Sequence, residues 1–166
     1  MITILRLGHR IFRDQRVTTH VFLAARAFGC ESGFYSGQRD SKLEDTIRKT
    51  SEQWGGKFSV KHTESWKKTI RDFNGAKAHL TVYGMPIQGN IKKIRKSKDL
   101  LVIVGGEKVP PEVYDLADHN ISVTSQPHSE VSALAVFLHE YFQGKELKKK
   151  FAGKRTIIPQ ERGKKV

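Results

Sequence analysis

Short apolar runs alternate with amphipathic segments along this chain, and most of the runs stop at a glycine or a polar turn. The run Leu100–Val104 has no polar break and is rich in β-branched residues, which is typical of a strand buried on both faces in a parallel sheet. Gly105-Gly106 ends this run, and Pro110-Pro111 suits the first turn of a helix, where a missing N–H costs nothing. The segment therefore predicts a central strand, a loop of bare backbone and a helix.

Two other stretches have the same form. Ala78–Tyr83 is a strand pattern that ends at Gly84, and Asn120–Val123 leads through a polar loop into an apolar helix. Ligands of open α/β sheets bind outside the carboxyl ends of the strands. Each loop taken singly is better explained as an ordinary turn of an α/β domain, but if the three predicted strands are neighbours, their loops converge on one pocket, which favours a binding site.

Strand and helix patterns alternate over the rest of the chain. We expect a helix from Thr18 or Thr19 to Phe28, and a second helix opened by the capping box Ser41-x-x-Glu44. Further helices are expected at 65–73, 90–95, 111–117 and 129–142, and strands at 2–7, 33–35, 58–62, 77–83, 100–104 and 121–123. The fold class is therefore α/β, a mainly parallel sheet with helices on both faces, with one domain over residues 1–142 and a basic C-terminal extension over 143–166.

Composition narrows the class of protein. At 166 residues the chain is long enough for one domain with a substantial core, and no run approaches the ~20 apolar residues that span a bilayer. The N-terminal segment has no basic region before its apolar residues and predicts a first strand, not a signal peptide. The one cysteine, Cys30, excludes an internal disulfide and fits a cytoplasmic protein.

The charge points to a polyanionic partner. The net charge is +13 and the pI is about 10.0, which favours nucleic acid over a membrane surface. Lys145–Val166 holds nine Lys or Arg against two Glu, and Ile91–Lys98 holds five basic residues in eight. The alternative is a merely solubilising surface, but clustered charge favours nucleic-acid binding.

Several common catalytic motifs are missing. Gly84–Gly89 has the glycine spacing of a P-loop, but Asn90-Ile91 stands where the lysine and hydroxyl residue should follow. No G-x-G-x-x-G, G-x-S-x-G or H-E-x-x-H occurs, and the seven histidines are scattered, so we expect no dinucleotide fold of the usual kind, no serine nucleophile and no metal site. Glu107 follows the two glycines, at the mouth of the predicted pocket. It is either a solvated loop residue or a group that contacts a ligand, and its position alone favours neither. Ser129 and Glu130 open the last long helix, where the dipole favours a carboxylate and free N–H groups face a polar ligand.

Two segments resemble the SPOUT superfamily of RNA methyltransferases. The segment Val104–Glu112, with Gly-Glu107 after a buried strand, resembles the second motif of the superfamily, and Ser129–Leu138 resembles the third. The N-terminal run His9–His20, with Ala25–Gly29, is similar to the archaeal tRNA ribose 2′-O-methyltransferases that modify cytidine 56 of the T loop.

The resemblance implies a deep trefoil knot at the C-terminal side of the sheet, a homodimer whose active site is completed across the interface, and tRNA as substrate. It implies S-adenosyl-L-methionine as cofactor, bound by residues of the three loops: Leu80, Gly105, Gly106, Glu107, Lys108, Val109, Val123, Thr124, Ser125, Gln126, Pro127, His128, Ser129 and Glu130. Relatives place an asparagine where Glu130 stands, and both Arg16 and Arg26 lie near their first-motif arginine.

Methyl transfer to a ribose hydroxyl needs the two reactants positioned and the hydroxyl proton removed, with no metal required. We assign Arg16 and Glu107 as the catalytic residues. Arginine is a poor base, so Arg16 is expected to grip a phosphate and orient the hydroxyl, while Glu107 shapes the pocket. Two other classes remain: a non-catalytic RNA-binding protein, and a nucleotide-using α/β enzyme, which the missing motifs disfavour.

Overall fold

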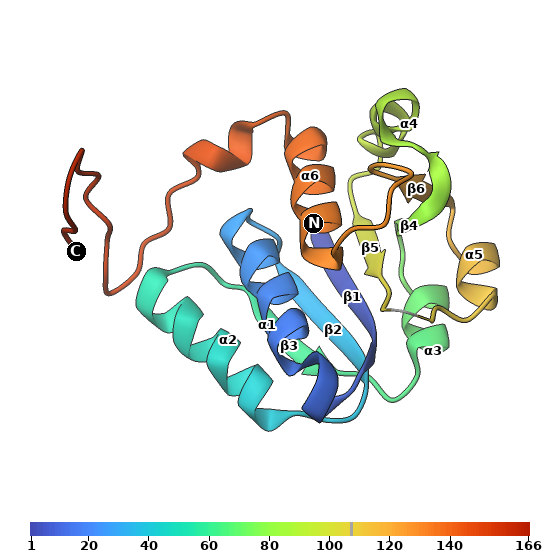
Figure 1. Cartoon of the computed structure of the whole chain (residues 1–166), viewed down its shortest axis with the longest axis horizontal. Helices are drawn as coiled ribbons and strands as arrows, with labels where there is room; N and C mark the ends of the chain where they lie inside the picture. The colour runs from blue at the N-terminus through green and yellow to red at the C-terminus, as the bar shows by residue number, and fades with distance from the viewer. Residues whose placement is uncertain (107) are drawn as a thin grey trace.

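The chain folds into one six-stranded sheet, seen in a computed structural model that describes residues 1–106 and 108–166. The strand order is β3-β2-β1-β5-β4-β6, and each neighbouring pair is parallel (Figure 1). The strands are β1 (Ile2–His9), β2 (Ser32–Gly37), β3 (Ser59–His62), β4 (Ala76–Pro86), β5 (Leu100–Val104) and β6 (His119–Ser122). The helices are α1 (Ile11–Ala27), α2 (Ser41–Trp54), α3 (Trp66–Arg71), α4 (Ile87–Ile94), α5 (Glu112–Leu116) and α6 (Glu130–Phe142), followed by the 3₁₀ helix η1 (Lys145–Lys148).

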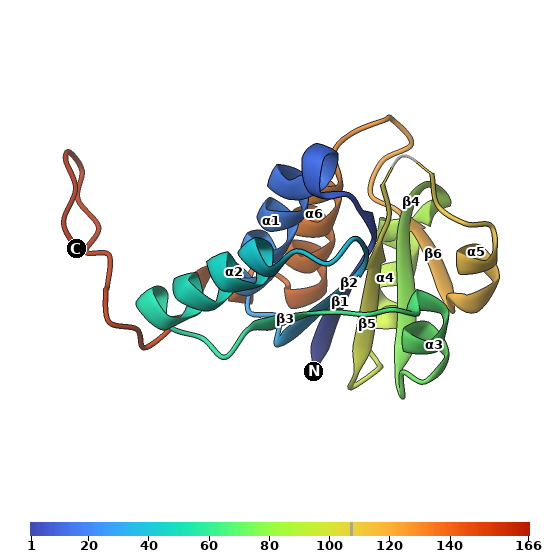
Figure 2. The same ribbon diagram turned by 90° about the horizontal axis from the view of Figure 1, so that it is seen from below.

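Helices cover both faces of the sheet, as the sequence predicted. Apolar residues of α1, α2, α4 and α6 pack on one face, and α3 and α5 cover the other (Figure 2). All five residues of β5 are buried between these layers, which confirms the prediction of a central strand with two apolar faces. The neighbours β5, β4 and β6 are the three strands whose loops were expected to converge.

The first two helices begin differently from the prediction. α1 begins at Ile11, seven residues before Thr18, because Thr18 is buried inside the helix and its hydroxyl pairs with His9 at 2.9 Å. The cap of α2 is Asp40, whose Oδ1 accepts from the amide of Leu43 at 3.1 Å, so the predicted capping box at Ser41 is wrong. The second member of that box, Glu44, instead accepts from the hydroxyl of Tyr35 at 2.7 Å.

The first part of the basic extension is packed on the domain. Glu146 is buried and its Oε1 lies 2.6 Å from His139 Nδ1 on α6. Phe151 lies under the guanidinium of Arg26, 5.7 Å from ring centre to Cζ, and the amide of Arg155 donates to the carbonyl of Gln53 at 2.9 Å. Residues 156–166 are exposed and extend away from the sheet (Figure 1).

Candidate functional site

The predicted loops after β5 and β6 line one cavity together with strand residues of β4, which continues through Gly84 to Pro86, so the loop predicted at Gly84 is wrong. The volume of the cavity is about 520 Å³. The middle of β4 supplies its apolar Leu80 and Val82, the loop after β5 supplies Gly105, Gly106 and Val109, and the segment after β6 supplies Val123 and the start of α6. Parallel strands bring their carboxyl ends to one edge of the sheet, so residues more than 40 positions apart meet here.

Most of the residues predicted to bind the cofactor line this cavity. The lining includes Leu80, Gly105, Gly106, Val109, Val123, Pro127, His128, Ser129 and Glu130. Thr124, Ser125 and Gln126 are exposed loop residues outside the lining, and Lys108 lies along a neighbouring cleft. Glu107 lies outside the described residues.

A buried arginine that the sequence did not single out lies behind the cavity. Arg6 of β1 is 1% exposed, and its Nη2 lies 3.3 Å from Glu130 Oε1, on the cavity wall. Its Nη1 donates to the carbonyl of Leu7, and a Cβ atom built on Gly106 would stand 3.2 Å from that same Nη1. Burial lowers the pKa of Arg6, and the negative charge of Glu130 opposes that shift. Glu130 therefore serves as the charge partner of Arg6.

His79 on β4 is a second buried polar group of the wall. Asn120 Nδ2 donates to the carbonyl of Tyr114, so Asn120 Oδ1 accepts from His79 Nδ1 at 2.9 Å. Nδ1 therefore carries the proton, and Nε2 is a buried acceptor without a partner among the described residues. Burial lowers the pKa of His79, with the Asn120 hydrogen bond opposing it, which keeps the ring neutral.

The two candidate arginines of the first motif lie away from the cavity. Arg16 lines the groove between the start of α1 and the start of α2, next to Arg39 and Lys42. Arg26 is buried at the other end of α1, where its Nη2 donates to the carbonyl of Gly55 at 2.6 Å. Arg13, one turn before Arg16, does line the cavity.

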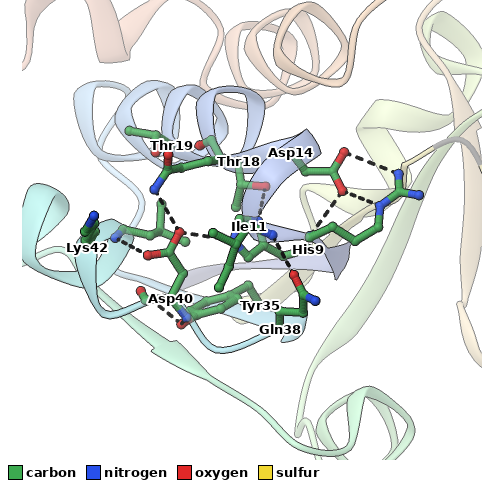
Figure 3. Close-up of polar contacts among 12 residues, drawn as sticks. His9, Ile11, Asp14, Thr18, Thr19, Tyr35, Gln38, Asp40 and Lys42 are labelled. Carbon is green, nitrogen blue, oxygen red and sulfur yellow. Dashed lines mark hydrogen bonds and ion pairs between the residues drawn. The ribbon is translucent and has the colours of Figure 1, made fainter.

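A hydrogen-bonded cluster holds the starts of α1 and α2 together (Figure 3). His9 is fully buried; its Nε2 donates to Asp40 Oδ2 at 3.3 Å, and its Nδ1 accepts from the Thr18 hydroxyl. Burial lowers the pKa of His9, although Asp40 opposes the shift, and burial raises the pKa of Tyr35 to about 12. For Asp40, the hydrogen bonds from Leu43 and His9 outweigh burial and lower its pKa. The polar groups of this cluster hydrogen-bond to one another, which indicates a structural role: the cluster holds the elements around the site in place.

Two absences hold for residues 1–106 and 108–166, the part of the chain that the structure describes. No group of three His, Cys, Asp or Glu side chains is placed to hold a metal ion. None of the helices is both long and apolar enough to cross a membrane.

Comparison with known families gives a consistent result. Residues 54–166 match the family model described as tRNA ribose 2′-O-methyltransferase, aTrm56. The chain is 54% identical over its whole length to the tRNA (cytidine(56)-2′-O)-methyltransferase of Picrophilus torridus, covering 48% of that protein. It is 52% identical, again over its whole length, to the tRNA (cytidine(56)-2′-O)-methyltransferase of Pyrococcus abyssi, covering 87% of it. The chain thus spans about half of the first relative and most of the second.

A solved structure shares the fold. The SpoU methyltransferase AviRb of Streptomyces viridochromogenes, solved in complex with the cofactor AdoMet, superposes with a TM-score of 0.59 at 12% sequence identity. The match covers 87% of this chain and 57% of AviRb. At that identity the likeness concerns the fold alone.

Proposed function

Because the chain belongs to the aTrm56 family of tRNA ribose 2′-O-methyltransferases, we propose that it methylates the ribose 2′-hydroxyl of cytidine 56 in tRNA. The observation that carries the proposal is the match over the whole chain, joined to the cavity that β4 and the loops after β5 and β6 form. S-adenosylmethionine, when bound, would supply the methyl group that replaces the hydroxyl proton of the ribose, and that proton would pass to an acceptor. The protein has to hold both reactants in line.

The cavity fits an adenosyl cofactor. Its apolar side chains, Leu80, Val82, Val109 and Val123, suit the faces of a purine, and bare main chain at Gly105-Gly106 offers N–H and C=O groups to polar edges. We propose that the described lining residues hold the cofactor, together with Glu107, and that Thr124, Ser125 and Gln126 close over it.

Arg16 remains our proposed catalytic residue, acting across a homodimer. It lies outside the cavity of its own subunit, so it reaches a reacting ribose only in a partner's site. Phe12, fully exposed on the first turn of α1 between basic residues, supports a subunit contact there, since large apolar side chains on a surface mark interfaces. Glu107 is proposed to shape the pocket mouth.

The same proposal includes the knot and the location of the protein. After β6, at the edge of the sheet, the chain returns to α6, which packs against α1, and the segment between them lines the cavity beside the loop after β5. That path supports the C-terminal trefoil knot, with residues 143–166 as an extension of the domain. A tRNA substrate and a single, buried cysteine thiol support a cytoplasmic protein.

Mapping ribose methylation on tRNA incubated with the pure protein and S-adenosylmethionine tests the function. We expect one new 2′-O-methyl group, at cytidine 56. A thermal-shift series with S-adenosylmethionine, NAD and ATP is run beside it, and only the first is expected to raise the melting temperature. A protein that binds tRNA but gives no methylation and no shift is the non-catalytic RNA-binding alternative.

Mixed dimers test the shared site. Arg16→Ala subunits lack the positioning arginine, and Gly106→Val subunits lack room at the cofactor loop. Each homodimer should lose activity, roughly 10²-fold for Arg16→Ala, as positioning losses typically do. Heterodimers of the two should regain activity, because one of their two sites is intact. Full activity of Arg16→Ala alone would remove this residue from the mechanism.

A further inference from the structure

A second cleft opens directly beside the cofactor cavity. It has a volume of about 580 Å³ and lies where β1 and β2 end, next to the loop after β5. The two hollows share Gly106 and Arg13, which line both. A group bound in the cleft therefore lies next to whatever the cavity holds.

The floor of this cleft is bare main chain. β1 shifts register between Arg6 and His9, and Gly8 there has φ +68°, in the left-handed region. A Cβ atom built on Gly8 would meet nothing within 4 Å, so the space above this residue belongs to the cleft. The amide of Gly8 is held by Ser36 Oγ at 3.1 Å, which fixes the floor on β2.

The rim of the cleft is cationic. Arg10, Arg13 and Lys108 line it, and its described lining residues include no carboxylate. Arg10 is paired with Asp14, whose Oδ2 lies 2.8 Å from Arg10 Nε. The side chains of Arg13 and Lys108 are exposed and line the cleft together with the shared Gly106. Cationic side chains bind phosphate, and the exposed main chain at Gly8 leaves room for a sugar. Together they suit the phosphodiester and sugar of a nucleotide.

We propose that this cleft receives the sugar–phosphate backbone of the target nucleotide, with Arg13 at the junction as a positioning residue and Lys108 as a phosphate contact. The inference rests on the proposed function, and it specifies the RNA side of the same site. It also assigns Lys108 to substrate binding instead of cofactor binding. Arg13 then gives each subunit an arginine of its own where the methyl group is transferred. Arg13 holds the phosphate beside the reacting ribose, and Arg16 of the partner acts from the other side.

Three variants test the cleft, each measured for S-adenosylmethionine affinity by calorimetry, tRNA affinity by filter binding, and kcat and KM for methylation. Lys108→Ala should weaken tRNA binding roughly fivefold to tenfold and leave cofactor affinity unchanged, since it removes one phosphate contact. Gly8→Asn, which tolerates the left-handed backbone, should fill the floor and weaken tRNA binding similarly. Arg13→Ala should lower kcat by roughly 10²-fold, and Arg13→Lys should recover little of it.

Lys49→Ala, an exposed lysine of α2 outside every hollow described above, is the matched control for loss of one positive charge. Melting temperatures show whether each variant folds. If Gly8→Asn does not fold, Lys108→Ala still tests the cleft, because Lys108 is exposed. The inference is overturned if Lys108→Ala binds tRNA as tightly as the wild type does. It is also overturned if this variant loses affinity for S-adenosylmethionine instead of for tRNA. If the wild type methylates nothing but the cleft variants still lose tRNA affinity, the proposed function fails and the cleft stands as an RNA site.

Discussion

At the scale of single residues, β1 and β4 hold ionisable groups that the fold keeps away from water. Arg6, His9 and His79 are each at most 1% exposed, and each has a pKa lowered by burial. Lost hydration disfavours the charged form of a base, and each group is instead held by a specific partner on another element. These partners position the loops of the cavity, because an unpaired group at such a depth is costly.

The buried histidines predict how stability depends on pH. Their pKa values in the folded state lie below the unfolded value of about 6.5, so the unfolded chain binds more protons in this range. Their contribution is complete above about pH 6.5 and is lost as the pH falls below it, by at most about 1.4 kcal/mol per pH unit for each histidine.

Urea unfolding at pH 7.5 and pH 5.5 measures this loss, and His79→Gln should reduce it. The lowered pKa of Asp40 does not interfere, since its contribution disappears only below about pH 4. A free energy of unfolding that stays constant or rises on acidification would contradict the assignment of neutral, buried rings.

At the scale of elements, the strands follow their apolar runs, and the start of α2 is held by a side chain of the loop that precedes it. Asp40 accepts from the amide of Leu43 in α2 and also from Gln15 in α1, at 3.3 Å, besides holding His9 at the end of β1. One carboxylate thus joins three elements. Such a cap fixes the relative placement of α1 and α2, and with it the groove that carries Arg16.

Substitutions at the start of α2 separate this cap from the capping box expected from sequence. Asp40→Ala should lower the free energy of unfolding by about 2 kcal/mol, since it removes a helix cap. Ser41→Ala should change it by less than about 0.5 kcal/mol, as for most exposed positions. Urea titrations at pH 7.5 measure both, and Asp40→Asn, which still caps, serves as the intermediate case. If Ser41→Ala lowers the free energy of unfolding more than Asp40→Ala does, the capping box at Ser41 would be the correct assignment.

The sequence was sufficient for features that depend on local pattern. The central strand at Leu100–Val104, the three neighbouring strands and their shared cavity follow from apolar runs that end in glycine or polar loops. It was not sufficient for features that depend on distant partners. Arg6 interrupts an apolar strand and gives no sign of its ion pair, because Glu130 is 124 positions away. Neither spacing nor composition separates Arg13, on the wall of the cavity, from Arg16, in another groove.

At the scale of the whole molecule, the net charge of +13 is divided between surfaces with different roles. The extension carries seven of these charges, but part of it holds the fold together. Lys149 Nζ donates to the carbonyl of Gly29 at 3.1 Å and stands 5.6 Å from the centre of the Phe151 ring. Lys148 and Lys150 flank it and are exposed. The exposed lysines of α4, Lys92 and Lys93, form a second basic surface next to β4.

The salt dependence of tRNA binding distinguishes these roles. Each lysine that neutralises a phosphate releases counterions, so its removal should reduce the slope of log K against log salt concentration by about 1. The double variant Lys148→Ala/Lys150→Ala should therefore reduce the slope by about 2, as should Lys92→Ala/Lys93→Ala. Lys149→Ala should chiefly lower the melting temperature, because its ammonium is already engaged with the Gly29 carbonyl and the Phe151 ring. Filter binding at several salt concentrations gives the slopes, and Lys49→Ala, which removes one charge where each double variant removes two, measures the effect of net charge per lysine. If tRNA affinity is independent of salt, or if both double variants keep the wild-type slope, these lysines only solubilise the protein, and the clefts described above supply the binding.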